Sequence, residues 1–125
     1  MESFDERIAQ LNKMIADARS IVFFTGAGIS TGSGIPDFRS ADGLYTTSEE
    51  ADPEYMLSHT CLNTEPQRFF EYMRKNMDFR KAEPNIAHLK ISELQRTRTV
   101  SVITQNIDGL HQKAGSKEVL ELHGS

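Results

Sequence analysis

The residues that most directly suggest chemistry form a glycine-rich loop at positions 25–40, TGAGISTGSGIPDFRS. Small residues let backbone N–H groups approach a pyrophosphate closely, and Ser30 and Thr31 add hydroxyl donors. The G-x-G-x-x-G fingerprint of dinucleotide-dependent oxidoreductases is broken, because Gly26 and Gly28 fit it while threonine stands at position 31. The glycines by themselves therefore leave two interpretations open, a phosphate-binding loop and a tight turn.

The loop ends in four residues of different chemical type, Pro36-Asp37-Phe38-Arg39. The guanidinium of Arg39 can pair with a phosphate or a carboxylate in a fixed fork geometry. An aromatic ring such as that of Phe38 can shield a reactive centre or stack on a planar ligand. The alternative is that Phe38 belongs to the core while Asp37 and Arg39 are solvated charges. Taken alone, this tetrapeptide favours the alternative.

A second group of polar residues, Gln105, Asn106 and Asp108, directly follows the β-branched stretch TVSVIT. Such a stretch predicts a strand, and ligands bind at the carboxyl ends of parallel strands in α/β sheets. The amides supply donors and acceptors for hydroxyl groups, and the carboxylate can accept a hydrogen bond from an amide or a ribose. The alternative is a polar turn that caps a helix at residues 109–114.

Histidine supplies the third candidate, because His123 in the sequence ELHG also follows a predicted strand. Its imidazole has the pKa that suits proton transfer near neutral pH. The other histidines have plainer interpretations: His59 lies in a predicted loop, and His88 packs or is exposed on a helix. His111, on a short helix, could serve a site, but a structural role is preferred. No histidine, cysteine or carboxylate pair has the spacing of helical metal ligands, so we expect no metal site within these residues.

These groups need elements that hold them together, and helical and strand patterns do alternate along the chain. The first predicted helix is residues 4–18, with a capping box at Ser3–Glu6, and a second follows the glycine loop. A third follows a capping box at Thr64–Gln67 and buries Phe69 or Phe70, Met73 and Met77. Pro84 opens a fourth helix, and residues 109–114 form a fifth. The predicted strands are 20–24, buried on both faces, 99–104 and 118–122, while 41–63 is loop with short helical pieces. The expected fold is α/β, a Rossmann-like parallel sheet of about three strands.

Composition sets further limits, since the chain has 125 residues and a formal net charge of −4. This length suits one modest domain, and the mild acidity argues against nucleic acid as a partner. The N-terminus does not have the pattern of a signal peptide, and no stretch is apolar enough for a membrane helix. A single cysteine, Cys61, excludes internal disulfides and multi-cysteine metal sites. We therefore expect a cytoplasmic protein without a membrane partner.

The motifs GAGIS, GIPDFR, TQNIDGLH and ELHG, in that order, resemble those of the sirtuin family of NAD-dependent protein-lysine deacylases. The intervening residues also match, with DGLY after the second motif and QKAG after the third. The resemblance covers residues 20–125, so it extends over most of the chain. It implies a Rossmann-like NAD-binding domain, NAD as cofactor and acetylated-lysine proteins as substrates.

The resemblance also implies roles for individual residues. Ala27 and Thr31 would line the diphosphate site, Phe38 would cover the reactive ribose carbon, and Asp108 would hold the nicotinamide carboxamide. His123 would be the general base, and Asn106 the second catalytic residue. The cofactor-binding residues implied in this way are Gly26, Ala27, Gly28, Thr31, Asp37, Phe38, Arg39, Gln105, Asn106, Ile107, Asp108 and His123.

The implied reaction transfers an acyl group from lysine to ADP-ribose and releases nicotinamide. Sirtuin catalytic domains are longer than this chain, and they carry a zinc ribbon and further strands that have no counterpart in residues 1–125. We therefore expect residues 1–125 to form a partial NAD-binding domain, the N-terminal half of a sirtuin, with the zinc ligands absent and the isolated chain inactive. The alternative is a non-catalytic module that binds NAD, ADP-ribose or a partner.

Overall fold

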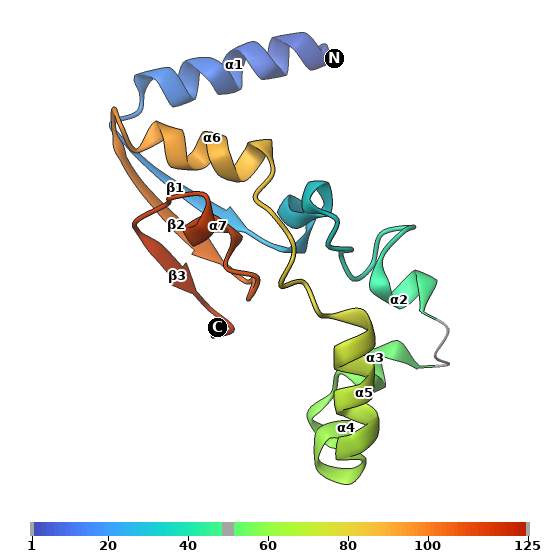
Figure 1. Cartoon of the computed structure of the whole chain (residues 1–125). Coiled ribbons are helices and arrows are strands. Elements are labelled where there is room, and N and C mark those ends of the chain that lie inside the picture. The colour runs from blue at the N-terminus through green and yellow to red at the C-terminus, as the bar shows by residue number, and fades with distance from the viewer. Residues whose placement is uncertain (1, 49–51, 125) are drawn as a thin grey trace.

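The computed structural model describes residues 2–48 and 52–124, and it is built on a three-stranded parallel sheet (Figure 1). The strand order follows the chain: β1 (Ser20–Thr25), β2 (Thr99–Thr104) and β3 (Val119–Glu121). Both connections pass through helices, as parallel pairing requires. The predicted α/β class with about three parallel strands is confirmed.

The helical elements are α1 (Phe4–Asp17), the 3₁₀ helix η1 (Ala27–Ser33), α2 (Leu44–Thr47), α3 (Pro53–Met56), α4 (His59–Thr64), α5 (Pro66–Asn76), α6 (Ile86–Leu94) and α7 (Leu110–Lys113). The short helices α2, α3 and α4 confirm the helical pieces expected before α5. Within the described residues, no helix combines the length and apolar character needed to cross a membrane.

The helix starts were predicted with mixed success. The capping box of α1 is present, because the Ser3 hydroxyl accepts from the Glu6 amide and the Glu6 carboxylate accepts from the Ser3 amide. The predicted capping box of α5 is wrong, since Thr64 ends α4 and the residue that caps α5 forms no side-chain cap. For α6 the N-cap is Asn85 rather than Pro84, because the Asn85 side chain accepts from the backbone of the first turn.

The strand register brings three loops to one edge of the sheet. Thr25 pairs with Thr104, and Thr104 pairs with Glu121 on the next strand. The loops that begin at residues 26, 105 and 122 therefore leave the sheet side by side. This edge is the carboxyl end of every strand, where open α/β sheets bind their ligands.

Two apolar clusters stabilise the fold. In the first, Ile91 of α6 packs on Val100 and Val102 of β2, and Figure 1 shows α6 lying along the sheet. The second lies within the group of helices α2–α5, which Figure 1 shows beside the end of the sheet rather than on its face. Its buried members are Leu44, Met56, Cys61 and Tyr72.

The other face of the sheet is uncovered in the described chain. Val22 is 60% exposed and Phe24 66%, so the prediction that β1 is buried on both faces is wrong. Phe24 lies in one register row with Ile103 and the exposed Leu120. A continuous apolar run shows that a strand is suited to burial on both faces, but it does not supply the element that covers the second face.

This uncovered face predicts self-association of the 125-residue chain. Phe24→Ser should shift the chain toward monomer, because it removes a large apolar side chain from the exposed row. Stability should change by less than about 0.5 kcal/mol, since the side chain is mostly solvated. Sedimentation velocity over a concentration series measures the effect. Phe70→Ser is the matched control, because Phe70 is also an exposed phenylalanine, at 50%, but lies on α5. Equal association of Phe24→Ser and the parent chain would contradict the prediction.

Candidate functional site

A cavity of about 420 Å³ opens between the carboxyl ends of the three strands and the region of α5, including the segment that follows this helix. Ala27 comes from the loop after β1, Asn106 from the loop after β2, and His123 from the loop after β3. Met73 and Met77, predicted as buried residues of the α5 region, line the other side. The cavity is therefore bounded by chain segments that are far apart in sequence.

The cavity brings together most of the residues that the sequence suggested. Those that line it are Ala27, Phe38, Gln105, Asn106, Ile107, Asp108 and His123. Five further predicted residues do not line it: Gly26, Gly28, Thr31, Asp37 and Arg39. Their cofactor contacts stay predictions.

Ser30 is the residue that links the glycine loop to the loop after β2. It is buried, and its hydroxyl donates to Asp108 Oδ2 at 2.6 Å. The other oxygen of Asp108 accepts from the Leu110 amide at 3.0 Å. The sequence presented Ser30 only as a hydroxyl donor beside Thr31, and its spacing from Asp108 along the chain gives no sign of this contact. The carboxylate is thus fixed from both sides.

Asn106 is held just as firmly. Its Nδ2 donates to the Gly26 carbonyl at 3.0 Å and to Ser30 Oγ at 3.2 Å, while its backbone amide donates to Thr104 Oγ1 at 3.1 Å. Both amide hydrogens are therefore used inside the protein. Among the described residues, no hydrogen bond reaches Asn106 Oδ1, which leaves this oxygen as an acceptor for a ligand.

The glycine loop, which was expected to precede a helix, itself forms the 3₁₀ helix η1. Gly34 ends it with φ +82°, a left-handed conformation that favours glycine. A Cβ at Gly28 would meet no described atom within 4 Å, so the space over the loop is open. Thr31 is exposed and its hydroxyl donates to the Gly28 carbonyl. The loop can therefore receive a group that approaches its backbone closely.

The tetrapeptide Pro36–Arg39 makes a tight turn against the start of α2. Asp37 Oδ1 accepts from the Ser40 hydroxyl at 2.5 Å, and the Asp37 carbonyl accepts from the Leu44 amide. A Cβ at Gly43 would lie 2.7 Å from Asp37 Oδ1, so the turn has room only for glycine there. The Asp37 carboxylate thus organises the turn, which directs Phe38 toward the cavity.

Arg39 lies outside the cavity, with its guanidinium 5.4 Å from the centre of the Tyr45 ring and 3.7 Å from Glu54 Oε1. A different arginine, Arg80, lines the cavity, and no motif in the sequence pointed to it. It pairs with both carboxylate oxygens of Asp78, and this contact lowers the pKa of Asp78 to about 2. The cavity therefore has a cation on its rim whose charge is largely matched by its neighbour.

The histidines divide into exposed and buried groups. His123 is exposed, and no described hydrogen bond orients its ring. His88 and His111 are fully buried, so of the two alternatives for His88, packing is confirmed over exposure, while the structural role of His111 stays a prediction. Among the described residues, no group of three or more histidine, cysteine or acidic side chains could hold a metal ion.

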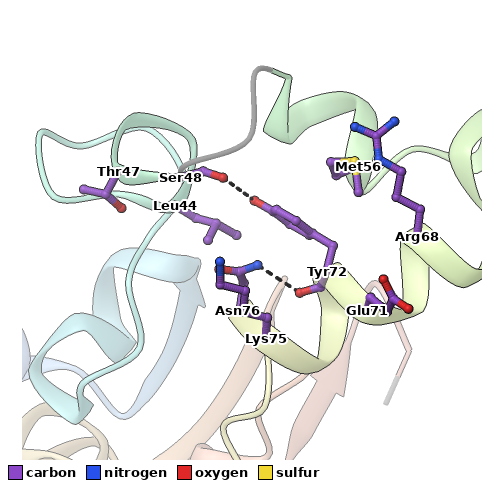
Figure 2. A pocket seen from close by; sticks show the side chains of 9 residues that line it. All are labelled: Leu44, Thr47, Ser48, Met56, Arg68, Glu71, Tyr72, Lys75 and Asn76. Carbon is purple, nitrogen blue, oxygen red and sulfur yellow. Dashed lines mark hydrogen bonds between the residues drawn. The ribbon is translucent and has the colours of Figure 1, made fainter.

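A second cavity, of about 350 Å³, lies within the helices α2–α5 (Figure 2). Tyr72 crosses it and donates from its hydroxyl to Ser48 Oγ at 3.4 Å, while Asn76 Nδ2 donates to the Tyr72 carbonyl. None of the sequence-predicted site residues lines this cavity. The candidate site is therefore the cavity at the strand ends, where carboxylate, amide, aromatic and imidazole groups converge.

Comparison with known proteins agrees with this geometry. The sequence model of the Sir2 family matches residues 26–125. An NAD-dependent protein deacetylase from Listeria monocytogenes is 53% identical over 116 residues, a match that covers 93% of this chain and 50% of the relative. One from Clostridium acetobutylicum is 50% identical over 123 residues, which covers 96% of this chain and 50% of that protein.

Solved structures give the same answer. A chain from work on the mechanism and regulation of Sir2 enzymes superposes with a TM-score of 0.86 at 47% identity, covering 98% of this chain and 48% of that one. A Sir2 protein with a deacetylated p53 peptide and 3′-O-acetyl ADP ribose superposes with a TM-score of 0.81 at 37% identity, covering 94% and 47%.

This chain spans about half the length of the relatives that it matches. The family match nevertheless includes every loop at the carboxyl edge of the sheet, and the resemblance to sirtuins drawn from the motifs is confirmed. The chain belongs to the Sir2 family.

Proposed function

We propose that the cavity at the strand ends binds NAD and that the chain forms the NAD-binding part of a protein deacetylase. The observation that carries the proposal is the convergence of Ser30, Asn106 and Asp108. Ser30 donates to Asp108 at 2.6 Å, and Asn106 donates to Ser30 at 3.2 Å and to the Gly26 carbonyl at 3.0 Å. A preorganised set of acceptors is what binding a polar ligand at low free-energy cost requires. The names of the relatives support NAD as that ligand.

The residues present fit the nicotinamide end of NAD. Asp108 offers carboxylate oxygens to the carboxamide N–H groups, and Asn106 Oδ1 offers an acceptor for a ribose hydroxyl. The open space over Gly28 suits the diphosphate, because a side chain there would fill it. Ala27, Thr31 and Arg39 belong to the same proposal, together with Gly26, Asp37, Gln105 and Ile107.

When bound, NAD supplies an electrophilic ribose carbon with nicotinamide as the leaving group. The half-buried ring of Phe38 lines the cavity and would keep water from that carbon. His123 would accept a proton from a ribose hydroxyl, a task that suits a neutral imidazole. Asn106 would orient the ribose through its free oxygen.

Acetylated-lysine proteins are the proposed substrates. A Sir2 structure described as bound to acetylated peptide superposes with a TM-score of 0.75 at 34% identity, and the match covers 94% of this chain and 45% of that one. The proposal assigns no zinc to residues 1–125, because a zinc ribbon needs several cysteine ligands and the single cysteine here, Cys61, is buried. Zinc is expected only in longer members of the family.

A module that binds NAD or ADP-ribose without turnover is the second candidate. It is favoured by the exposure of His123, since a general base is ordinarily held in place by another group. The two candidates share the cavity and differ in whether the chain supports turnover once the other half of a deacetylase completes it.

The nicotinamide contact is tested by Asp108→Asn in the 125-residue chain. Affinity for NAD should fall by about 1.5–3 kcal/mol, the usual worth of a hydrogen bond to a charged group. Affinity for ADP-ribose, which has no carboxamide, should change little. Isothermal calorimetry measures both, and Asp42→Asn, in an exposed loop, is the matched control. Equal losses for NAD and ADP-ribose would contradict the assignment of Asp108 to the carboxamide.

Turnover by the 125-residue chain is tested with NAD and an acetyl-lysine peptide. We expect NAD binding but no O-acetyl-ADP-ribose by mass spectrometry, because orientation of the reacting groups can be worth several kcal/mol and nothing described orients His123. Turnover equal to that of the Listeria monocytogenes relative would contradict this expectation and exclude the non-catalytic module.

The role of His123 is tested in a hybrid in which residues 1–125 replace the matching half of that relative. His123→Ala should lower the deacetylation rate by about 10² to 10⁴, the range for a general base, and leave NAD binding largely intact. His59→Ala is the control, since His59 is also exposed but lies on α4. A His123→Ala hybrid that deacetylates within a few-fold of the parent would refute the assignment.

A further inference from the structure

Two fully buried histidines lie next to each other behind the candidate site. His88 is on α6 and is 0% exposed, and His111 is on α7 and is 1% exposed. Their ring centres are 5.0 Å apart, and the rings meet edge to face at 67°. Each ring has one nitrogen without a hydrogen-bond partner among the described residues, Nε2 of His88 and Nδ1 of His111. Buried polar atoms rarely stay unpaired, so these two need an explanation.

The protonation of His88 follows from its neighbour. The backbone N–H of Asn85 donates to His88 Nδ1 at 3.2 Å. A nitrogen that accepts a hydrogen bond carries no hydrogen, so in the neutral imidazole the hydrogen is on Nε2. The unpaired atom of His88 is therefore a donor.

The protonation of His111 follows from two threonines. The Thr25 hydroxyl donates to Thr104 Oγ1 at 2.9 Å, and Thr25 Oγ1 lies 2.9 Å from His111 Nε2. A hydroxyl has one hydrogen, so Thr25 must accept from the N–H at Nε2 of His111. Nδ1 of His111 then carries no hydrogen, and the unpaired atom of this ring is an acceptor.

We infer that His88 and His111 are a donor–acceptor pair, joined from Nε2–H to Nδ1 directly or through one water, and that they act as positioning residues for Asn106. The two unpaired atoms are complementary in type, and the rings that carry them are buried and in contact, one on α6 and the other on α7. Joining them completes a chain of hydrogen bonds that runs from Asn85 through His88, His111, Thr25 and Thr104 to the backbone amide of Asn106.

This hydrogen-bond chain connects the two loops that make the site. At one end, Asn85 Nδ2 donates to the Ile29 carbonyl of the glycine loop at 2.7 Å. At the other end, Thr104 Oγ1 holds the amide of Asn106. The histidine pair therefore fixes the position of Asn106 relative to the glycine loop without touching a ligand. Only the consequence for NAD rests on the proposed function.

The arrangement also requires both rings to stay neutral. A second proton on His88 would sit on Nδ1 and repel the Asn85 N–H, which donates to that atom. A second proton on His111 would sit on Nδ1 and repel the N–H of His88 Nε2. Burial lowers the pKa of both imidazoles, and His88 lowers the pKa of His111 further. The carboxylate of Asp108 raises both pKa values, but by less. The pair's contribution to stability is complete above the ordinary value of 6.5 and is lost as the pH falls through the lowered folded-state values.

The direct test is the tautomer of each ring in the 125-residue chain, read from ¹⁵N shifts after histidine labelling. We expect the hydrogen on Nε2 in both His88 and His111 at pH 7.5, and the same neutral forms at pH 6.5. The exposed His59 is the comparison in the same spectrum. A hydrogen on Nδ1 of either buried ring, or protonation of either ring at pH 6.5, would overturn the inference. This measurement needs neither NAD nor a variant.

The positioning role is tested at Thr25, which lies in the middle of the hydrogen-bond chain. Thr25→Val keeps the shape but removes the hydroxyl, and it should speed hydrogen exchange of the Asn106 amide at least about tenfold. Thr25→Ser keeps the hydroxyl and should restore slow exchange. Thr99→Val is the matched control, because Thr99 is exposed and lies at the first position of β2, far along the strand from Thr104. Equal exchange in Thr25→Val and Thr25→Ser would overturn the positioning role.

The consequence for the ligand is a separate measurement. If the parent chain binds NAD, Thr25→Val should weaken that binding several-fold more than Thr25→Ser does. NAD affinity that is the same in the two variants would overturn the link to the ligand. No NAD binding by the parent would instead refute the proposed function, while the tautomers and the exchange rates would still decide the histidine pair.

Discussion

The parallel register of β1 against β2 is the constraint on which the site depends. It places Thr25 beside Thr104, and the Gln105 amide donates to the Thr25 carbonyl just beyond the last pair. Because successive side chains of a strand point to opposite faces, a slip of one residue would move Thr104 to the other face and break its bond to Thr25. Ser30 and Asp108, separated by 78 positions in the chain, meet only in this register.

Most of the carboxyl edge could be predicted from the sequence, because strand patterns and polar loop residues are local signals. TVSVIT identifies β2, and the polar residues after it identify the loop that carries Asn106 and Asp108. The contacts of these residues could not be predicted, since they depend on which loops the register brings together. Ser30 shows this best: nothing in its neighbourhood indicates that its partner is a carboxylate in another loop.

The misses have physical causes of the same kind. The segment expected to be an irregular glycine loop forms a 3₁₀ helix, a tight turn that ends at Gly34 in a left-handed conformation. Thr64 closes α4 instead of capping α5, since two helices compete for one residue. Val22 and Phe24 are apolar but uncovered, because residue type reports suitability for burial and not the presence of a cover. Arg80 lines the cavity because of how the chain folds after α5, and no local sequence signal marks it.

The site combines two kinds of histidine, and their difference follows from where they lie. His88 and His111 are enclosed between α6, α7 and the sheet, where burial favours the neutral ring and hydrogen bonds fix its orientation. Such groups transmit position but cannot exchange protons with a ligand that they do not touch. His123 is exposed at the cavity, and among the described residues no hydrogen bond fixes its ring. The two proposals therefore assign positioning and proton transfer to different residues of the same chemical type, and the hydrogen-bond chain that ends at Asn106 belongs to the positioning pair.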